Sequence, residues 1–400
     1  FISIDDEHES VSKTLEYAYD DWCIAQMALI LKKDAEYAYF MKRSQSWKNL
    51  FDWNIGFMRP KKNGGWEKPF DPREINNNFT EGNSWQYSFF VPQDIPGMIE
   101  AYGGNEKFEA KLDEMFNSES KTTGREQVDV TGLIGQYAHG NEPSHHMAFL
   151  YNYIGKPEKT TEKVHYILNN FYKNTPDGLI GNEDCGQMSA WYVLSSMGIY
   201  TICPGKDYWE RDKPIFNDAK LNLENGKSYQ VYSPLNRSNL FSQEGRETID
   251  EDFPEITPVP VIEAESKSFK DKMTVKIEFS NLKQRNYRGQ GIKYRVLDEN
   301  NRNPEFEHYT QNIEITKSSK IEAFVISSIE ASGPTSDTIS AAFFKKPNKY
   351  TIDIKSKFNP QYHAGGTDGL LDGIFGTTNW RKGDWQGYQS QDFEAVVDLQ

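Results

Sequence analysis

The stretch VSKTLEYAYDDWCIAQMAL at residues 11–29 decides the character of the first half of the chain. Its apolar positions, three or four residues apart, are Val11, Leu15, Ala18, Trp22, Ala25 and Leu29. That spacing is the period of an α-helix with one buried face. The stretch therefore predicts a long helix that packs through this face.

Further helices are expected up to residue 200, at 34–49, 83–102, 105–117, 144–154, 157–173 and 186–199. Asp34 is placed to cap the first of them, Gly103 and Gly104 close the second, and Pro157 stands where a first-turn proline belongs. Together these segments predict seven helices joined into consecutive antiparallel hairpins. Irregular loops are expected at 50–80 and 118–143, and loops of that length are usually functional or disordered.

From about residue 205 the pattern changes to alternating β-branched runs such as TVKIEFS, KYRVLD and KIEAFVIS, separated by Gly, Pro and Asn. The segment TPVPVI at 257–262 is interpreted as a linker, and KKPNK at 345–349 as a second boundary. The expected parts are 1–205, 206–256, 257–345 and 346–400. The predicted fold class is therefore multidomain, with helices first and β-structure later in segregated blocks.

Composition narrows the function classes. A net charge of −14 argues against nucleic acid, whose binding depends on Lys and Arg. Three cysteines cannot form a disulfide framework, no spacing resembles a zinc site, and no apolar run reaches the ~20 residues of a membrane helix. Aromatic residues make up 14%, which suits sugar stacking but equally suits a core rich in aromatics.

Both ends of the chain are expected to be cut. Phe1 is not an initiator methionine and no signal peptide follows it, while EAVVDLQ at 394–400 stops within an apparent strand. The absence of a targeting signal here therefore does not bear on the localisation of a parent protein.

Polar motifs stand at the amino ends of alternate predicted helices: TEGNSWQY at 80–87, HGNEPSHH at 139–146 and GNEDCGQ at 181–187. Alternate helices of antiparallel hairpins point the same way, so the motifs are expected at one end of the assembly. Helix amino termini favour carboxylates through their unpaired N–H groups. Capping would explain one such motif, but three motifs with Gly-Asn and a carboxylate indicate one shared site.

The chemistry of these motifs is dominated by carboxylates, namely Glu81, Glu142, Glu183 and Asp184. There is no nucleophile elbow, phosphate loop or dinucleotide fingerprint. Two carboxylates on either side of a glycosidic bond are the usual equipment of glycoside hydrolysis. The remaining carboxylates and amide oxygens would suit a hard cation such as calcium.

The motif order resembles glycoside hydrolase family 92 over roughly residues 1–235. The resemblance lies in SVSKTLEYAYDDWCIAQMA, GFMRPK, TEGNSWQY, PQDIPGMIEAYGG, DVTGLIGQYAHGNEPSHHMAFLYNYIGKP and GLIGNEDCGQMSAWYVLSSMGIYTICPG. It implies an exo-acting α-mannosidase that inverts configuration, uses a bound calcium, and is built on an (α/α)₆ toroid preceded by a β-sandwich domain. The implied partners are mannose-containing glycans in N-glycan degradation, with α-1,2 as the linkage expected first, although the sequence does not fix the linkage.

The resemblance also implies roles for individual residues. Glu81 matches the general acid and Asp184 the general base. Some relatives carry Asp-Glu-Asp in the last motif, and Asn182 stands here in place of the first aspartate. The residues expected to bind substrate are Asn83, Trp85, His145, His146, Asn182 and Glu183. Asn141 and Glu142 are the expected calcium ligands, and a buried, satisfied core pair is the alternative for the two histidines.

Six hairpins need twelve helices, so the resemblance implies a partial toroid that lacks about five helices and the β-sandwich domain. The chain alone is accordingly expected to be inactive, and its parent to be secreted, periplasmic or on the cell surface. Residues 258–345 resemble a chitobiase-type β-sandwich module, and 350–400 the start of a discoidin-like (F5/8 type C) module. The rival interpretations are another (α/α)₆ carbohydrate enzyme, such as a glucosidase or polysaccharide lyase, and a non-catalytic surface sugar-binding protein.

Overall fold

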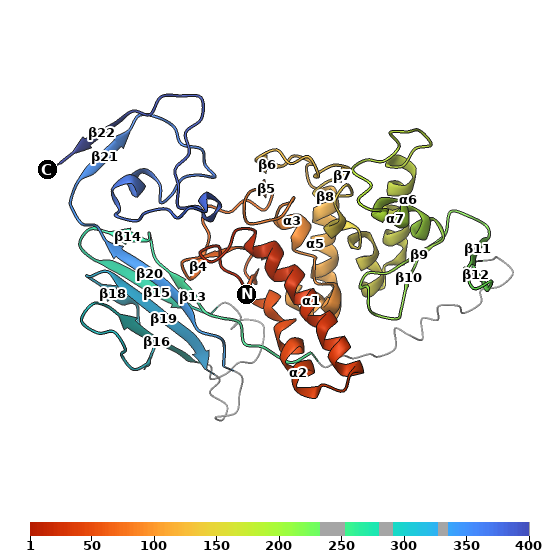
Figure 1. Ribbon diagram of the computed structural model, residues 1–400, viewed down its shortest axis with the longest axis horizontal. Coiled ribbons are helices and arrows are strands. Elements are labelled where there is room, and N and C mark those ends of the chain that lie inside the picture. Colours follow the sequence, from red (N-terminus) through yellow and green to blue (C-terminus); the bar gives the residue numbers. More distant parts are fainter. Residues whose placement is uncertain (233–252, 280–290, 327–334, 400) are drawn as a thin grey trace. The chain divides into compact units, whose positions relative to one another are not determined.

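The computed structural model describes residues 1–232, 253–279, 291–326 and 335–399. The chain divides into two compact units. Unit 1 comprises Phe1–Ala18, Gln45–Thr80 and Pro254–Gln400, and unit 2 comprises Tyr19–Ser44 and Glu81–Phe253. The longer strands belong to unit 1 and most of the helices to unit 2 (Figure 1). Among the described residues, no helix has both the length and the hydropathy to cross a membrane.

Helices dominate the first 200 residues of the chain. The α-helices are α1 (Ser10–Ile30), α2 (Asp34–Arg43), α3 (Ser84–Tyr87), α4 (Ile95–Tyr102), α5 (Asn105–Asn117), α6 (Pro157–Asn170) and α7 (Gln187–Ser196). The 3₁₀ helices are η1 (Ser46–Asn49), η2 (Pro92–Asp94), η3 (Glu142–Ser144), η4 (Met147–Ile154), η7 (Thr367–Leu371) and η8 (Trp380–Lys382). The expected order of helices first and strands later is therefore present.

The predicted buried face of α1 is confirmed from Val11 to Ala25, whereas Leu29 is 50% exposed in the last turn. Asp34 is not a cap but the first residue of α2, and α2 ends at Arg43 instead of continuing to 49. The side-chain amide of Gln93 donates to the carbonyl oxygen of Ser44 at 3.1 Å, which draws that carbonyl away from helical pairing. Tertiary hydrogen bonding therefore shortens the second helix.

The helix expected at 83–102 is interrupted. Val91 lies outside the helical region, with φ −135° and ψ 59°, because it precedes Pro92 and the residue before a proline is disfavoured in the helical region. Pro157 begins α6 as predicted, and Gly103 closes α4 in the left-handed conformation. The segment at 144–154 is 3₁₀-helical rather than α-helical.

The strands are short in the first half of the chain and longer after residue 219. The former are β1 (Phe51–Asp52), β2 (Phe57–Met58), β3 (Lys61–Lys62), β4 (Gly65–Trp66), β5 (Glu74–Ile75), β6 (Thr123–Gly124), β7 (Leu133–Ile134), β8 (Tyr137–Ala138), β9 (Ile199–Tyr200) and β10 (Glu210–Arg211). The latter are β11 (Ala219–Asn222), β12 (Ser228–Tyr232), β13 (Val261–Glu263), β14 (Ser268–Phe269), β15 (Met273–Glu278), β16 (Gly291–Leu297), β17 (Glu307–His308), β18 (Ile313–Ile315), β19 (Ser319–Ile326), β20 (Ile339–Lys345), β21 (Thr351–Ile354) and β22 (Ala395–Asp398).

Two sheets in unit 1 share one apolar core. Their strand orders are β13-β15-β18 and β14-β20-β19-β16-β17. Side chains alternate between buried and more exposed along β15 and β19, as the two-residue period of a strand requires. The core contains Val275 from one sheet and Ile321 from the other. The expected linker at 257–262 is packed rather than free, because Val259 and Ile262 belong to the same core.

The predicted loop at 50–80 docks on these strands within unit 1. Ile262 N donates to Gly64 O at 2.9 Å, while Asn63 exchanges hydrogen bonds with the backbone of Ala342 at 2.9 and 2.8 Å. A side chain at Gly65 would place its Cβ 2.7 Å from Ile262 O, so only glycine permits this approach. Residues 1–18 and 45–80 therefore group with the β-structure. The boundaries at 205, 256 and 345 stay predictions, and residues 233–252 of the expected 206–256 part lie outside the described residues.

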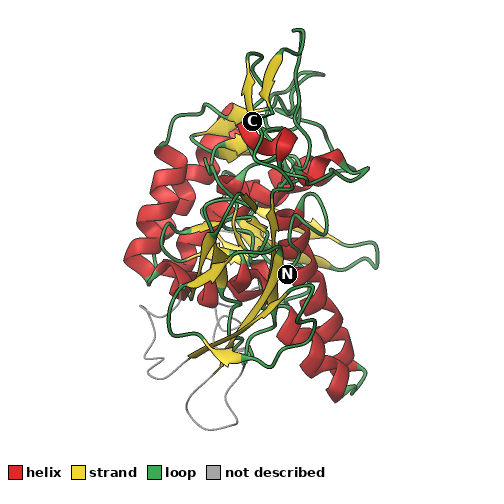
Figure 2. Cartoon of the chain, turned by 90° about the vertical axis from the view of Figure 1, so that its left-hand side faces the viewer, coloured by secondary structure: helices red, strands yellow, loops and turns green. Residues whose placement is uncertain are grey.

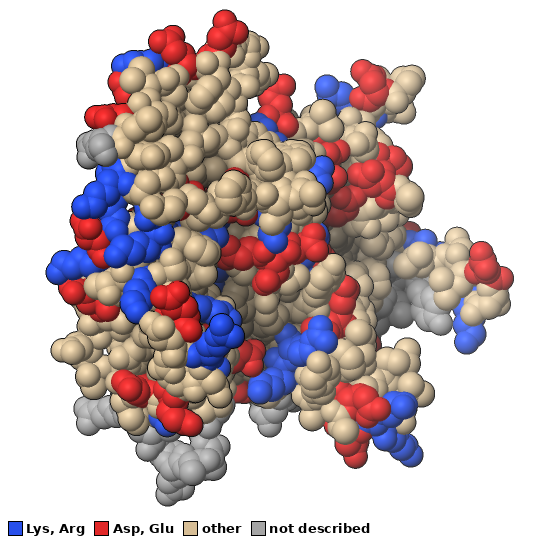
Figure 3. Space-filling view, turned by 60° about the vertical axis from the view of Figure 1, so that its left-hand side comes forward, with Lys and Arg blue, Asp and Glu red and all other residues tan. Residues whose placement is uncertain are grey.

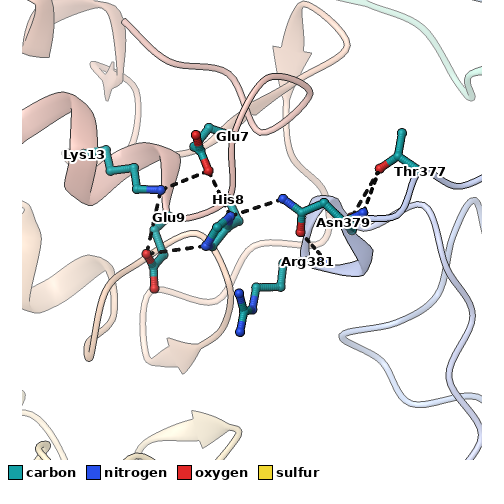
Figure 4. Close-up of polar contacts among 7 residues, drawn as sticks. All are labelled: Glu7, His8, Glu9, Lys13, Thr377, Asn379 and Arg381. Carbon is teal, nitrogen blue, oxygen red and sulfur yellow. Dashed lines mark hydrogen bonds and ion pairs between the residues drawn. The ribbon is translucent and has the colours of Figure 1, made fainter.

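Residues 346–399 contribute the antiparallel pair β21–β22 and long connecting loops to unit 1 (Figure 2). Figure 4 shows where η8 meets the start of the chain: Asn379 Nδ2 lies 3.3 Å from His8 Nδ1. Glu7 joins the same cluster, its Oε1 lying 3.1 Å from both His8 Nδ1 and Lys13 Nζ. These polar contacts fix the last segment on the first one.

Candidate functional site

The first motif supplies a strained residue followed by a helix cap. Glu81 is exposed and has φ 50°, in the left-handed region that non-glycine residues seldom adopt. Asn83 caps α3 in a reciprocal box with Gln86, and its Nδ2 donates to Gln136 Oε1 at 3.1 Å. Asn83 is fully buried and makes the contacts of a structural cap, which do not support the predicted role in lining a sugar pocket.

The second motif joins the first through Asn141. Its Nδ2 donates to Glu81 O at 2.9 Å, which fixes the backbone that carries the first carboxylate. The following residue, Glu142, opens η3 and is half-buried. The motifs at 80–87 and 139–146 are therefore in direct contact within unit 2.

Glycines bring the third motif against the second. A Cβ built at Gly181 would lie 3.0 Å from both Cα and O of Gly140. At Gly140 a Cβ would overlap Thr131 Oγ1, at 1.8 Å. The backbones of Gly140 and Gly181 thus touch, and a larger residue at either position would push them apart. The predicted convergence of the motifs is confirmed.

Three carboxyl groups meet where the motifs converge. The carboxyl groups of Asp184 and Glu81 lie close enough to that of Glu142 to influence its ionisation, Asp184 more strongly than Glu81. Burial is the largest cause that raises the pKa of Glu142, and the neighbouring carboxylates of Asp184 and Glu81 raise it further. Glu142 therefore keeps its proton to higher pH than an ordinary glutamate and can donate it to Asp184.

Asp184 lies on a strained turn at the start of α7. Asp184, Cys185 and Gly186 have φ of 50°, 56° and 93°, so three consecutive residues are left-handed. Such conformations cost about 1–3 kcal/mol for a non-glycine residue and cluster at functional sites. The turn leaves Asp184 exposed beside Glu142.

The two residues before Asp184 have local partners. Glu183 accepts hydrogen bonds from Ser189 N at 3.0 Å and Ser189 Oγ at 2.8 Å, so it satisfies the first turn of α7. Asn182 Nδ2 donates to Asp129 Oδ1 at 3.3 Å. The roles of Asn182 and Glu183 in substrate binding stay predictions. The hydrogen bonds described here are equally consistent with a structural role for both residues.

His145 and His146 are buried and neutral. The ring Nε2 of His145 donates to His139 O and that of His146 to Phe89 O, each at 2.9 Å. Burial lowers the pKa of each imidazole to about 4. These are the contacts of the satisfied core pair that was the alternative interpretation, although Gln187 Nε2 also lies 3.3 Å from His145 Nδ1 at the edge of the site.

His139 is a buried residue that packs beside His145, and it was not among the site residues predicted from the sequence. Its Nδ1 lies 2.8 Å from Tyr137 OH and its Nε2 2.7 Å from Tyr172 OH. Burial is the main cause that lowers its pKa to about 2, and the positive form of His145 would lower it further. Its ring also meets the Trp191 ring at a centroid distance of 4.5 Å. The signal was available, because His139 opens the motif that contains Glu142.

Trp85 is buried too, with Lys111 Nζ 4.6 Å from its ring centroid. A ring that is covered in this way stabilises the packing behind α3 and is not an exposed platform for a sugar. The predicted role of Trp85 in substrate binding therefore has no support in its exposure.

The donor chemistry of the site suits a hard cation. Asn141 uses its amide nitrogen on Glu81, so its oxygen is the atom that could face a metal, and Glu142 and Asp184 add carboxylate oxygens. Among the described residues, no group of three or more His, Cys, Asp and Glu side chains is arranged to hold a metal ion. Calcium at Asn141 and Glu142 would therefore need carbonyl or water oxygens as well, and it stays a prediction.

Known proteins resemble this chain mainly in its first part. Residues 1–247 match the profile of the glycosyl hydrolase family 92 catalytic domain. A protein of Arthroderma benhamiae described as an uncharacterized secreted glycosidase is 30% identical over an alignment of 236 residues. The match covers 53% of this chain and 28% of that protein.

Solved structures point the same way. A family GH92 α-mannosidase of Bacteroides thetaiotaomicron in complex with mannoimidazole is 42% identical, with a TM-score of 0.55 over 57% of this chain and 31% of its own. Another structure of that enzyme is 43% identical, with a TM-score of 0.53 over 57% of this chain and 30% of its own. The chain thus spans less than a third of the length of these relatives. Because the family profile covers more than half of the chain, the protein belongs to glycosyl hydrolase family 92.

Proposed function

We propose that Glu81, Glu142 and Asp184 form the catalytic centre of an exo-acting glycosidase that removes terminal α-linked mannose. The observation that carries the proposal is the meeting of three carboxyl groups from three separate motifs, one of which holds its proton more tightly than usual. The similar Bacteroides protein is described as an α-mannosidase and was solved with mannoimidazole, which supports mannose as the sugar.

Two carboxyl groups have distinct tasks in this proposal. Glu81 protonates the departing glycosidic oxygen, and Asp184 removes a proton from the water that attacks the anomeric carbon from the opposite face. The product then has inverted configuration. Glu142 lies beside Asp184 and, in its protonated form, would donate a hydrogen bond that orients the base. To act as the acid, Glu81 must hold a proton near neutral pH, and for an exposed side chain this requires a negative neighbour.

Calcium is the proposed metal, held by Asn141 and Glu142 with additional backbone or water oxygens. When bound, the cation would supply positive charge beside the sugar and the carboxylates. The donors named above are suited to such a cation, because they are oxygen atoms of carboxylate and amide groups.

The finer architecture is also a proposal. The packing of α4 with α5 and of η4 with α6 supports helical hairpins, of which a partial (α/α)₆ toroid would be built. The two sheets of unit 1 support the assignment of 257–345 as a chitobiase-type module. The description of the Arthroderma relative as secreted supports a secreted or cell-surface location, and α-1,2-linked mannose in N-glycans is the substrate to test first.

The test is mannose release by the whole protein from a disaccharide and from an activated aryl mannoside. Glu81→Gln should lower the rate on the disaccharide by about 10²–10⁴-fold, and much less on the aryl substrate, whose leaving group needs no proton. Asp184→Asn should lower both rates, since both need an activated water. Glu183→Gln is the matched control, because it keeps a hydrogen-bonding cap for α7.

Proton NMR of the first product gives the stereochemistry, and β-mannose is the product of inversion. Glu81→Gln and Asp184→Asn enzymes that hydrolyse both substrates at the wild-type rate would remove these residues from the mechanism. Release of glucose but not mannose from matched substrates would remove mannose from the proposal.

A further inference from the structure

A cavity in unit 1 has no role in the proposed hydrolysis. It encloses about 230 Å³ between residues 62–68, 262–267 and 363–384. Small-molecule sites are usually about 300–1,000 Å³, so this cavity has room for one small unit rather than a whole oligosaccharide. A second cavity of about 70 Å³ shares Glu67, Lys68, His363 and Gly383 with the first. The two therefore adjoin.

Some of the charged side chains around the larger cavity have polar partners within unit 1. Lys68 Nζ lies 2.7 Å from Glu263 Oε2, and Lys62 Nζ donates to Gly383 O at 2.9 Å. Asp372 accepts from Ile374 N at 2.7 Å. On the face drawn in Figure 3, basic and acidic side chains are likewise interspersed. The lining carries both acidic and basic side chains, so no single sign of ligand charge is selected, and we take a neutral ligand as the one to test.

Trp66 and Phe343 are the aromatic residues that line the larger cavity, and Trp66 is the less buried of the two. Trp66 is half-buried, and Lys61 Nζ lies over its ring at 3.9 Å from the centroid. Lys61 is only 1% exposed, so it fixes the indole in place and covers one of its faces. Arg59 Cζ also lies 5.8 Å from the Trp66 ring centroid, so the cavity reaches the part of the indole that these two cations leave uncovered. A flat aromatic face beside hydrogen-bonding groups is the usual lining for the apolar C–H face of a sugar ring.

The smaller cavity adds polar groups that need a partner. Asn78 is 3% exposed, and its Nδ2 donates to Glu67 Oε2 at 2.5 Å. The Oδ1 atom of Asn78 is buried and accepts no hydrogen bond from any described residue. An unsatisfied buried acceptor costs about 1–3 kcal/mol, so a donor from a ligand would be favoured there. Burial also raises the pKa of Glu67, which can then donate as well as accept.

Arg381 and His363 complete the smaller cavity. Figure 4 shows Arg381 next to Asn379 in η8, where Asn379 Oδ1 accepts from Arg381 N at 3.2 Å. Burial is the main cause that lowers the pKa of His363, and Lys62 lowers it further, so the imidazole is neutral and offers one donor and one acceptor. Hydroxyl groups, which both donate and accept, match this mixture of groups.

We propose that these adjoining cavities bind one neutral hexopyranose unit of a glycan, with the sugar ring against Trp66 and hydroxyl groups at Asn78 and His363. This second site does not depend on the proposed mannosidase activity. It would hold a glycan on unit 1 irrespective of hydrolysis at Glu81 and Asp184.

Saturation-transfer NMR with methyl α-mannoside and methyl β-galactoside tests the proposal on the whole protein. At least one of these neutral probes should bind. Glu265→Trp should abolish the binding of methyl β-galactoside and the part of the methyl α-mannoside binding that is not due to the proposed catalytic centre, because residue 265 is exposed on the cavity lining and an indole there would fill the opening. Glu265→Gln, the matched control, should bind normally.

Trp66→Leu provides a second variant, and it should weaken binding about tenfold, as expected for losing an aromatic contact. Circular dichroism of each variant confirms folding. Glu81→Gln should retain this binding, which separates failure of this site from failure of the proposed hydrolysis.

The proposal is overturned if neither neutral sugar binds the wild type, or if their binding is equal in wild type, Glu265→Trp and Trp66→Leu. Tighter binding of mannose 6-phosphate than of methyl α-mannoside would also overturn it, because the ligand would then be recognised by its charge.

Discussion

The close approach of Gly140 to Thr131 gives the sharpest test of how the site is assembled. In Gly140→Ala the new Cβ would lie 1.8 Å from Thr131 Oγ1 and 3.1 Å from Thr131 Cβ. The φ of Gly140 is not left-handed, so alanine adds no backbone strain there and the effect is steric. Overpacking of this kind costs about 1–3 kcal/mol. Unit 2 should therefore lose about 2 kcal/mol of stability, or about 4–8 °C in its melting midpoint.

Thr131→Ala provides the rescue. Thr131 Oγ1 is buried and has no hydrogen-bond partner among the described residues, so removing it should change stability by less than about 1 kcal/mol. In the double variant the 1.8 Å overlap disappears, and the contacts at 3.1 Å with residue 131 Cβ and at 3.3 Å with Asp129 O remain. Most of the lost stability should return.

Urea unfolding of the wild type, both single variants and the double variant measures this coupling as a double-mutant cycle. Mannose release should follow the same order, because Gly140 precedes the residues that hold Glu81 and carry Glu142. A Gly140→Ala protein as stable and active as the wild type would refute the proposed glycine contact. Additive effects of the two substitutions would refute the assignment of the clash to Thr131.

Three further predictions concern the carboxyl groups. Because the folded-state pKa of Glu142 is raised, the stability that its proton gives is complete at acid pH and is lost as pH rises through the folded pKa. The free energy of unfolding in urea should therefore fall less from pH 4 to pH 8 in Glu142→Gln than in the wild type. An identical fall in the two proteins would contradict this prediction. Chelation should abolish mannose release and added calcium should restore it, whereas full activity in excess chelator would exclude the metal. A crystal structure with a bound mannoside should show the carboxyl groups of Glu81 and Asp184 about 6.5–9.5 Å apart, while about 5–5.5 Å would indicate a retaining enzyme.

The sequence by itself determined the order and type of the main elements. The apolar positions of α1 follow the helical period. Gly103 marks the end of α4, and Pro157 marks the beginning of α6. It also determined that three motifs would meet, because each stands before a helix and carries Gly-Asn with a carboxylate. These features are local, so residue identity and spacing are enough to predict them.

Only the tertiary structure decided what each side chain in the motifs does. Asn83 caps α3 and Glu183 caps α7, whereas Glu142, expected only as a metal ligand, shares a proton-dependent contact with Asp184. His145 and His139 are buried and neutral, which the sequence could not distinguish from roles at the surface of the site. The physical reason is that burial and charge proximity depend on segments about 40–100 residues apart in sequence, which only the folded chain brings within hydrogen-bonding distance.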